Sequence, residues 1–241
     1  MRMMNPEELA KYIEFTNLDN TATDEHMKIF FDIAKKYNFY AVVISPHYVN
    51  LASTILKDTD IKVVTVIDFP LGAGSTEAKI VEAKTAIKNG ADEIDMVANI
   101  PAIKSHDFEL VEKDIKSVKE AIGETTLKVI IEAPLITDEE KAISSRICDN
   151  CNVEFVKTST GFNGIQEFNQ MIDTITTIKK YAPHTKVKAA GGIRNYKTAY
   201  NIISSGIDKI GTSSGPEIIE QLKQVLDNQE KDVGPTGPRL I

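Results

Sequence analysis

The sequence lacks the features that would point to a metal or a disulfide framework. It contains no tryptophan, two cysteines and four histidines in 241 residues. The histidines are scattered along the chain at His26, His47, His106 and His184. The cysteines, Cys148 and Cys151, form one C-x-x-C motif without a second pair, which is weak evidence for zinc or redox chemistry. We therefore expect no metal and no other cofactor, and we interpret the motif as incidental in a reducing cytosol.

The chain also lacks a basic patch and a long apolar run. Its formal net charge is −7, so nothing in the composition favours nucleic acid or an anionic membrane surface. No stretch approaches the roughly 18 consecutive apolar residues of a membrane-spanning helix. Residues 1–8 lack the apolar core of a signal peptide. We expect a cytoplasmic protein that binds neither nucleic acid nor membranes, and a phosphorylated ligand would have to be held by a few local groups.

Short apolar runs alternate with segments of helical spacing along the whole chain. The expected strands, some with the loop that follows, are 13–18, 40–44, 62–69, 93–100, 127–132, 154–162, 186–192 and 207–215. The expected helices cover 24–37, 47–56, 75–88, 105–122, 165–181 and 195–205, with others beginning after Thr137 and at Pro216. Eight such units fit the roughly 250 residues of a (β/α)8 barrel.

We therefore predict the α/β class and a single (β/α)8 TIM barrel over residues 1–227, followed by a flexible C-terminal tail over residues 228–241. A doubly wound sheet is the alternative. It would normally use fewer units and carry a G-x-G-x-x-G after its first strand, and this sequence has none there.

Two expected strands carry a lysine just before small residues and glycines. Lys157 precedes Thr158-Ser159-Thr160-Gly161, and Lys188 precedes Ala189-Ala190-Gly191-Gly192. A single strand lysine commonly lies at an edge with its ammonium group in water. Repetition on neighbouring strands favours chemistry instead. Burial and a second ammonium group both favour the neutral amine that a nucleophilic lysine needs.

The strand 93–100 adds a carboxylate to the same end of the barrel. Its alternation places Glu93 and Asp95 on the face opposite the apolar side chains, toward the barrel centre. Active sites of this fold lie at the C-terminal ends of the strands, so Asp95, Lys157 and Lys188 should meet at one mouth. Such a set suits Schiff-base chemistry with Asp95 assisting proton transfer. Alternatively, Asp95 and Lys188 form a buried ion pair that only stabilises the barrel.

The loops after the last two strands have the composition of a phosphate site. Gly191 and Gly192 allow close approach of backbone N–H groups, and Arg194 follows them. Residues 211–215 lead into a helix N-terminus, which favours an anion. These two loops form the usual phosphate site of the fold. The alternative is that both are tight turns with helix caps.

Several segments together resemble the deoxyribose-phosphate aldolase family: residues 63–72 with 76–79, 93–97, 155–162, 188–194 and 210–214. The resemblance extends from about Ile13 to Ser214. It implies a class I aldolase, free of cofactors, that reversibly cleaves 2-deoxy-D-ribose 5-phosphate to acetaldehyde and D-glyceraldehyde 3-phosphate in deoxyribonucleoside catabolism. It also implies a homo-oligomer, either a dimer or a tetramer, whose other partners are the phosphorylated sugar and the aldehydes.

By their positions in these motifs, Lys157 matches the Schiff-base lysine, Lys188 matches the lysine that perturbs it, and Asp95 matches the proton-relay aspartate. The residues expected to hold the substrate are Thr16, Thr160, Gly161, Gly191, Gly192, Arg194, Gly211, Ser213 and Ser214.

Four positions depart from the family pattern. Glu14 stands where members commonly carry aspartate, Asp68 replaces a glycine, and Ala133-Pro134 replaces Thr-Cys. We expect Asp68 to add a charge near the mouth of the third strand. Two other functions remain open: a related Schiff-base aldolase that acts on another phosphorylated sugar, and a catalytically silent sugar-phosphate binding protein.

Overall fold

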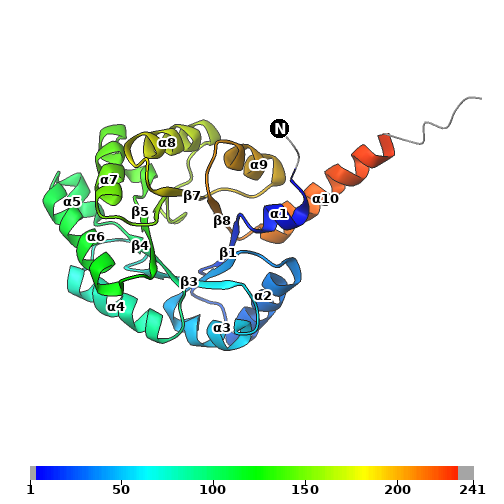
Figure 1. The fold of residues 1–241 in the computed structure, drawn as a ribbon, viewed down its shortest axis with the longest axis horizontal. Coiled ribbons are helices and arrows are strands. Elements are labelled where there is room, and N and C mark those ends of the chain that lie inside the picture. Colours follow the sequence, from blue (N-terminus) through cyan, green and yellow to red (C-terminus); the bar gives the residue numbers. More distant parts are fainter. Residues whose placement is uncertain (1–3, 233–241) are drawn as a thin grey trace, which may run out of the picture.

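In the computed structural model, which describes residues 4–232, eight parallel strands close into a barrel in chain order (Figure 1). The strands are β1 (Ile13–Asn17), β2 (Ala41–Ile44), β3 (Lys62–Ile67), β4 (Glu93–Val97), β5 (Thr126–Ile130), β6 (Phe155–Lys157), β7 (Lys186–Ala190) and β8 (Lys209–Thr212). The barrel closes where β8 pairs with β1, with Ile210 opposite Ile13. The predicted (β/α)8 barrel is confirmed.

Helices surround the barrel (Figure 1). They are α1 (Pro6–Ala10), α2 (Asp24–Tyr37), α3 (Val49–Leu56), α4 (Thr76–Lys88), α5 (Ile100–Lys104), α6 (Phe108–Ile122), α7 (Asp138–Asn150), α8 (Phe168–Tyr181), α9 (Tyr196–Ser204) and α10 (Gly215–Asp232). Two short 3-10 turns are η1 (Pro46–Tyr48) and η2 (Ala133–Leu135). Because α10 runs to Asp232, residues 228–232 of the expected tail are helical, and residues 233–241 lie outside the described part of the chain.

Side-chain caps start the helices where the sequence indicates. The Thr137 hydroxyl accepts from the Glu140 N–H at 3.2 Å, and the Glu140 carboxylate accepts from the Thr137 N–H at 2.7 Å. Ser75 caps α4 by accepting from the Ala78 N–H at 3.2 Å. A cap of this kind is typically worth about 1 kcal/mol to a helix. These caps fix the first residues of α4 and α7, which begin at the expected places.

The fourth strand is shorter than predicted. It ends at Val97, and Ile100–Lys104 forms the short helix α5. Asn99 caps this helix by accepting from the Ala102 N–H at 3.0 Å. Pro101 has no N–H to give to a sheet and has the backbone angle of a first helical turn. The alternation that suggested a strand up to residue 100 was therefore wrong over its last residues.

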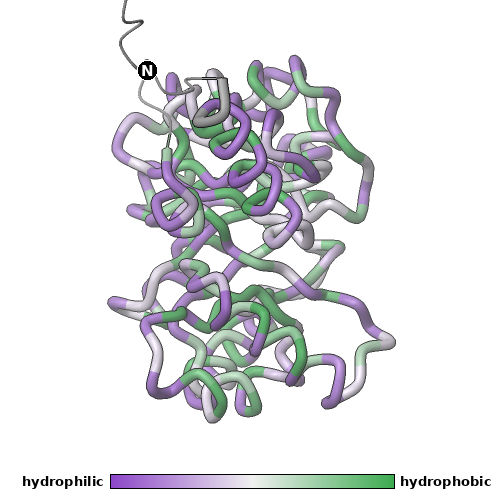
Figure 2. Tube along the Cα trace, turned by 90° about the vertical axis from the view of Figure 1, so that its right-hand side faces the viewer, coloured by the Kyte–Doolittle hydropathy of each residue, from purple (hydrophilic) through white to green (hydrophobic). Residues whose placement is uncertain are grey.

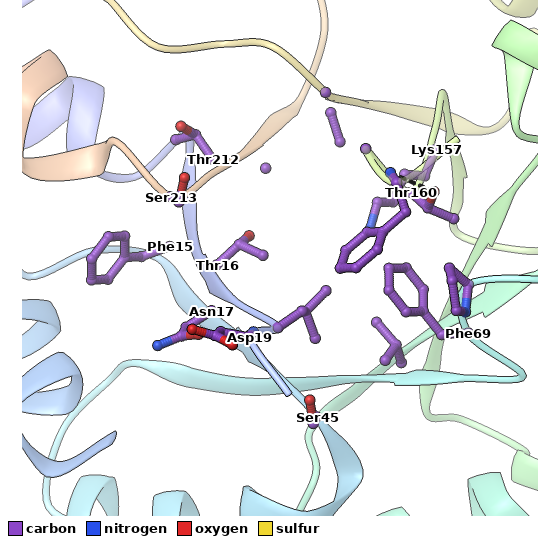
Figure 3. Close-up of a pocket in the computed structure, with 18 of the residues that line it drawn as sticks. Phe15, Thr16, Asn17, Asp19, Ser45, Phe69, Lys157, Thr160, Thr212 and Ser213 are labelled. Atoms are coloured by element: carbon purple, nitrogen blue, oxygen red, sulfur yellow. Dashed lines mark hydrogen bonds between the residues drawn. The ribbon is translucent and has the colours of Figure 1, made fainter. Parts of the chain in front are cut away.

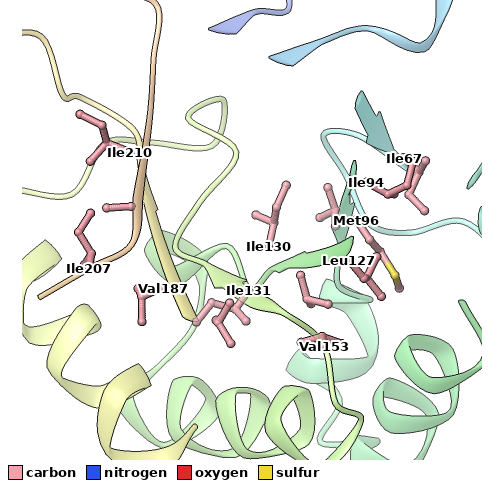
Figure 4. Packing of buried hydrophobic residues seen from close by; sticks show 14 of the residues in the cluster. Ile67, Ile94, Met96, Leu127, Ile130, Ile131, Val153, Val187, Ile207 and Ile210 are labelled. Atoms are coloured by element: carbon pink, nitrogen blue, oxygen red, sulfur yellow. The ribbon is translucent and has the colours of Figure 1, made fainter. Parts of the chain in front are cut away.

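Apolar side chains on the outer face of the barrel form the main core. Figure 2 shows hydrophobic segments running through the interior of the molecule, and Figure 4 shows Ile94, Met96 and Leu127 between the strands and the helices. All three are fully buried. Because side chains alternate along a strand, this packing sends every second residue of these strands into the barrel. The inner positions are therefore available for a site.

The described helices include none that is both long and apolar enough to span a bilayer.

Candidate active site

Charged side chains gather inside the barrel below its C-terminal mouth. Each is at most 5 % exposed. This charge cluster consists of Glu14 on β1, Glu93 and Asp95 on β4, Lys128 on β5, Lys157 on β6 and Lys188 on β7. Buried charges of this kind persist only when they are paired. The sequence-predicted trio of Asp95, Lys157 and Lys188 is therefore part of a larger paired network.

Asp95 lies at the centre of the charge cluster. Its Oδ2 accepts hydrogen bonds from the Nζ atoms of Lys157 and Lys188, both at 2.7 Å. Its Oδ1 accepts from Lys128 Nζ at 3.2 Å. Burial alone would raise the pKa of Asp95, but the three ammonium groups hold that pKa well below its usual range. The carboxylate therefore stays ionised, and one oxygen is shared between two lysines.

Lys157 has the environment of a nucleophile. Burial lowers the pKa of its amine to about 8, Lys188 contributes to the fall, and the charge of Asp95 opposes it. A substantial fraction of the amine is consequently neutral near pH 7 to 8, which is the form that attacks a carbonyl carbon. Lys157 also lines the cavity at the barrel mouth, whereas Lys128, Lys188 and Asp95 do not.

Lys188 is held behind Lys157. Its ammonium group contacts Glu14 on one side and Asp95 on the other, and the residue is fully buried. Asp95 and Lys188 thus do form the buried ion pair that the sequence left open. The same carboxylate oxygen also holds Lys157, which opens into a cavity, and a purely stabilising pair does not require that arrangement.

A cavity of about 840 Å³ opens above Lys157 at the barrel mouth (Figure 3). Figure 3 shows Lys157 and Thr160 across the opening from Thr16 and Ser213. Most of the expected substrate-binding residues line it, namely Thr16, Thr160, Gly161, Gly191, Gly192, Arg194, Gly211 and Ser213. Ser214 does not line it, and its N–H donates to the Thr212 hydroxyl at 2.9 Å.

The glycine side of the cavity exposes backbone rather than side chains. Gly191 and Gly192 have φ angles of 96° and 77°, which favour glycine. A Cβ atom on Gly191 would lie 2.7 Å from the Ser159 hydroxyl, so no side chain fits there. Arg194 follows on the same loop, is exposed, and has no hydrogen-bond or ion-pair partner within residues 4–232. This side of the cavity can therefore accept an anion through N–H groups and one guanidinium group.

Part of the cavity wall is apolar. Phe69 on the β3 loop and Phe162 on the β6 loop meet edge to face, with ring centroids 5.1 Å apart. Phe162 and Ile165 remain more than half exposed at the rim, at 57 % and 54 %. The wall is therefore mixed, since Phe15 also lines it beside Ser213 and Ile165 lies against Gly192. A small carbon chain with a charged end fits such a wall, with the charge beside Arg194.

Sequence reasoning missed Lys128. It is fully buried and contacts Glu93 Oε2 at 2.5 Å, Asp95 Oδ1 at 3.2 Å and Glu14 Oε1 at 3.6 Å. The available signal was its place in an otherwise apolar run, opposite Asp95 in the sheet register. Unlike Lys157 and Lys188, Lys128 is not followed by small residues and glycines, so the pattern that marked those two lysines does not mark it.

Glu132 was also missed, because it stands at the end of an expected strand. The residue is fully buried and has a left-handed backbone with φ of 49°. Its carboxylate accepts from the Thr160 N–H at 3.0 Å and the Thr160 hydroxyl at 2.5 Å, and from the Asn163 side-chain amide at 3.0 Å. Glu132 therefore fixes the loop that carries Thr160 and Gly161 into the cavity.

Asp68 does not add a charge to the cavity mouth, contrary to expectation. Its carboxylate lies 3.2 Å from Lys79 Nζ and accepts from the Gly74 N–H at 3.0 and 3.2 Å. Lys79 is fully buried and also contacts Asp114 at 2.6 Å. The charge of Asp68 is thus neutralised beside α4, and its role is to order the β3 loop.

The cysteines show no sign of reactivity. Cys148 and Cys151 are both free and buried. Burial raises the pKa of the Cys151 thiol to about 11 and raises that of Cys148 further, so both are protonated at neutral pH. Across residues 4–232, no group of three or more His, Cys, Asp or Glu side chains is placed to hold a metal ion.

Comparisons with known proteins agree on one family. A family model described as DeoC/LacD family aldolase matches residues 9–220. The deoxyribose-phosphate aldolase of Lactococcus lactis subsp. cremoris is 46% identical over 219 residues, which cover 89% of this chain and 97% of that protein. The deoxyribose-phosphate aldolase of Thermococcus kodakarensis is 45% identical over 222 residues, covering 90% and 98%. The solved structure of deoxyribose phosphate aldolase from Aeropyrum pernix, described as a unique tetramer, aligns with a TM-score of 0.83 at 31% identity, covering 93% of this chain and 94% of that one.

Proposed function

The chain belongs to the DeoC/LacD family of aldolases, and we propose that it reversibly cleaves 2-deoxy-D-ribose 5-phosphate to acetaldehyde and D-glyceraldehyde 3-phosphate in deoxyribonucleoside catabolism. One observation carries the proposal. The Lys157 amine, with its pKa lowered to about 8, shares an oxygen of Asp95 with Lys188 and opens into a cavity whose far end suits a phosphate. We assign Lys157 as the Schiff-base lysine.

The reaction begins at the Lys157 amine. The neutral Nζ attacks the C1 aldehyde carbon of the open-chain sugar and forms a carbinolamine, in which a proton has moved from nitrogen to oxygen. Loss of water then gives an iminium ion. Neither Asp95 nor Lys188 lines the cavity, so water carries the protons at this stage: it takes the amine proton, and the Lys188 ammonium group, 2.7 Å from Asp95 Oδ2, supplies through it the proton for the departing hydroxyl.

Carbon–carbon cleavage uses the iminium as an electron sink. Removal of the C3 hydroxyl proton sends its electron pair into the new C3 carbonyl, and the C2–C3 bond electrons move to the iminium nitrogen. D-glyceraldehyde 3-phosphate leaves, and an enamine of acetaldehyde stays on Lys157. Protonation of the enamine at C2 and hydrolysis of the resulting iminium release acetaldehyde and restore the amine. Asp95 and Lys188 are the groups that move these protons.

We assign the phosphate end of the substrate to the loops after β7 and β8. Backbone N–H groups around Gly191 and Gly192 and the hydroxyl of Ser213 approach the same end of the cavity as Arg194. In a chain with net charge −7, this local collection of donors has to supply the attraction for a phosphate. Among the described residues that line the cavity, Arg194 and Lys157 are the two side-chain cations.

Replacing Arg194 by methionine should weaken binding of the phosphorylated sugar without slowing the chemistry. We expect the KM for 2-deoxy-D-ribose 5-phosphate to rise about tenfold with kcat nearly unchanged, because a charge-assisted hydrogen bond is worth about 1.5 kcal/mol or more. Steady-state kinetics with deoxyribose that lacks the phosphate supplies the control, since its kcat/KM should not change. An equal loss with both sugars would contradict a phosphate role for Arg194.

Borohydride trapping tests the proposed function directly. We expect mass spectrometry to find one reduced adduct per chain, on Lys157, when the protein is treated with borohydride and 2-deoxy-D-ribose 5-phosphate. Folded protein that forms no adduct with any phosphorylated aldehyde would indicate a silent sugar-phosphate binding protein. Adducts with other phosphorylated sugars but not with this one would identify a related Schiff-base aldolase instead.

We also infer a homo-oligomer, either a dimer or a tetramer, and a cytoplasmic location. The tetrameric structure described for the Aeropyrum pernix relative supports assembly, and a phosphorylated metabolite as substrate is consistent with the location. Light scattering of the purified protein measures the mass of the assembly, and a monomer at micromolar concentration would contradict the first inference.

A further inference from the structure

Lys128 on β5 is a fully buried member of the charge cluster. In the register between β4 and β5 it lies directly opposite Asp95, and its side chain is fully buried inside the barrel. Its Nζ contacts all three carboxylates of the cluster: Glu93 at 2.5 Å, Asp95 at 3.2 Å and Glu14 at 3.6 Å. Lys128 does not line the cavity, and it is linked to Lys157 through the two oxygens of Asp95.

We propose that Lys128 is a positioning residue for the aldol reaction, which orients the Asp95 carboxylate and sets the charge balance around Lys157. The proposal rests on the proposed function, because it concerns the protonation of the Schiff-base lysine. Lys128 acts through Asp95 and does not take part in bond making or breaking.

The orientation follows from how the two oxygens of Asp95 are used. Oδ1 accepts from Lys128, so Oδ2 alone serves both Lys157 and Lys188. A carboxylate without Lys128 would be free to turn and give one oxygen to each remaining lysine. Sharing one oxygen keeps the two amines close together, and this closeness helps to lower the pKa of Lys157.

The charge balance follows from counting the cluster. It holds three carboxylates, Glu14, Glu93 and Asp95, and three lysines, Lys128, Lys157 and Lys188, so its net charge is zero when all are ionised. Loss of a proton from Lys157 makes the cluster −1, and formation of the cationic iminium returns it to zero. Without Lys128, the net charge of the cluster would be −2 with a neutral Lys157 and −1 with the iminium. A more negative cluster retains the proton on Lys157 more strongly.

Other titratable groups lie near Lys128 and its carboxylate partners, on or beside the neighbouring strands. The Tyr40 hydroxyl, just before β2, donates to Glu93 Oε1 at 2.7 Å. Lys209 on β8 acts electrostatically on Glu14 and Glu93, and its Nζ lies 3.5 Å from the Tyr40 ring centroid. The Nζ atoms of Lys128 and Lys186 lie 5.6 and 5.5 Å from the centroid of the Phe155 ring. None of these groups takes the place of Lys128 against Asp95.

The pKa shifts of Lys128 and Glu93 agree with a permanent positive charge on Lys128. Burial alone would lower the pKa of Lys128, but Asp95, Glu14 and Glu93 raise it above the ordinary lysine value. Burial would raise the pKa of Glu93, yet Lys128 and the Tyr40 hydroxyl bring it below the ordinary value. Lys128 therefore keeps its proton throughout the working pH range and supplies a constant positive charge rather than a relay.

The pH dependence of the enzyme tests this role. In the wild type, kcat/KM should rise with pH through the pKa of Lys157, about 8, because the neutral amine is the reactive form. For Lys128→Met we expect this rising limb to move to higher pH by about one unit, which lowers kcat/KM at pH 7 about tenfold. A general loss of activity with the limb in its original position would overturn the proposal.

Glu93 provides the charge-restoring variant. Glu93→Gln alone makes the cluster more positive, so the limb should move to lower pH. The double variant Lys128→Met/Glu93→Gln leaves Glu14, Asp95, Lys157 and Lys188, whose net charge is again zero, and the limb should return toward its wild-type position. If Lys128→Met alone does not fold, the double variant is compared with Glu93→Gln, from which it differs only at Lys128: its limb should lie at higher pH, and a limb at the same or lower pH contradicts the proposal.

Lys79 is the matched control. It is also fully buried and lies 2.6 Å from a buried carboxylate, that of Asp114, but it is outside the charge cluster. Lys79→Met should lose comparable thermal stability without moving the limb. Borohydride adduct formation, measured in the same samples, distinguishes failure of the proposed function from failure of the role assigned to Lys128. A wild type without adduct refutes the proposed function, whereas normal adducts with an unmoved limb in Lys128→Met refute only the role of Lys128.

Discussion

Replacing Lys157 by leucine is expected to reduce aldol cleavage by about 10⁴-fold or more and to remove the borohydride adduct. Leucine fills much of the same space but has no amine, so the covalent route is closed. Neither remaining lysine of the charge cluster can replace it, because Lys128 and Lys188 are fully buried, paired with carboxylates and absent from the cavity wall. Steady-state kinetics and intact mass measure both effects.

Two comparisons make this result specific. Thermal unfolding should show that the leucine variant remains folded, because Asp95 keeps Lys128 and Lys188 as partners. Lys157→Arg retains a positive charge beside Asp95 but offers no nucleophilic amine, so it should be as inactive as the leucine variant. Adduct formation at full stoichiometry in either variant would show that another lysine reacts and that the assignment of Lys157 is wrong.

The barrel fold and the meeting of Asp95, Lys157 and Lys188 could be predicted from the sequence for a physical reason. Side chains alternate along a strand, and strands of a barrel share one C-terminal mouth, so a lysine or aspartate at an inner position has only one place to point. Lys157 and Lys188 are direct neighbours in the sheet register, although they lie on separate strand–helix units. Sequence periodicity and the geometry of the fold were enough to bring them together.

The rest of the site depends on contacts that periodicity does not encode. Lys128 is buried because carboxylates from β1 and β4 converge on it, and a sequence pattern read one strand at a time does not show that. Asp68 looked like a charge at the cavity mouth, yet Lys79 on α4 draws its carboxylate away. Glu132 acts through a left-handed turn that no strand pattern predicts. In each case the partner comes from a distant segment.

Asp95→Asn is expected to separate Schiff-base formation from cleavage. Asparagine has nearly the same shape but removes the one carboxylate shared by three lysines, so the cluster becomes more positive by one charge. Because Asp95 opposes the lowering of the Lys157 pKa, its loss should shift that pKa below about 8. Adduct formation should therefore extend to lower pH. Cleavage should fall by about 10²–10⁴-fold, which is the usual contribution of a positioned proton-transfer group.

Stability has to be followed in the same experiment, because removing one partner of a buried ionic network typically costs about 3–5 kcal/mol. Asp114→Asn is the matched control, since Asp114 is also fully buried and ion-paired with a buried lysine, Lys79, at 2.6 Å. It should lose stability without changing the pH dependence of adduct formation. If Asp95→Asn lost adduct formation and cleavage in equal measure while folded, its carboxylate would be needed to form the iminium itself. If both persisted, the proton transfers would belong to Lys188 and water, and Asp95 would serve only to pair the lysines.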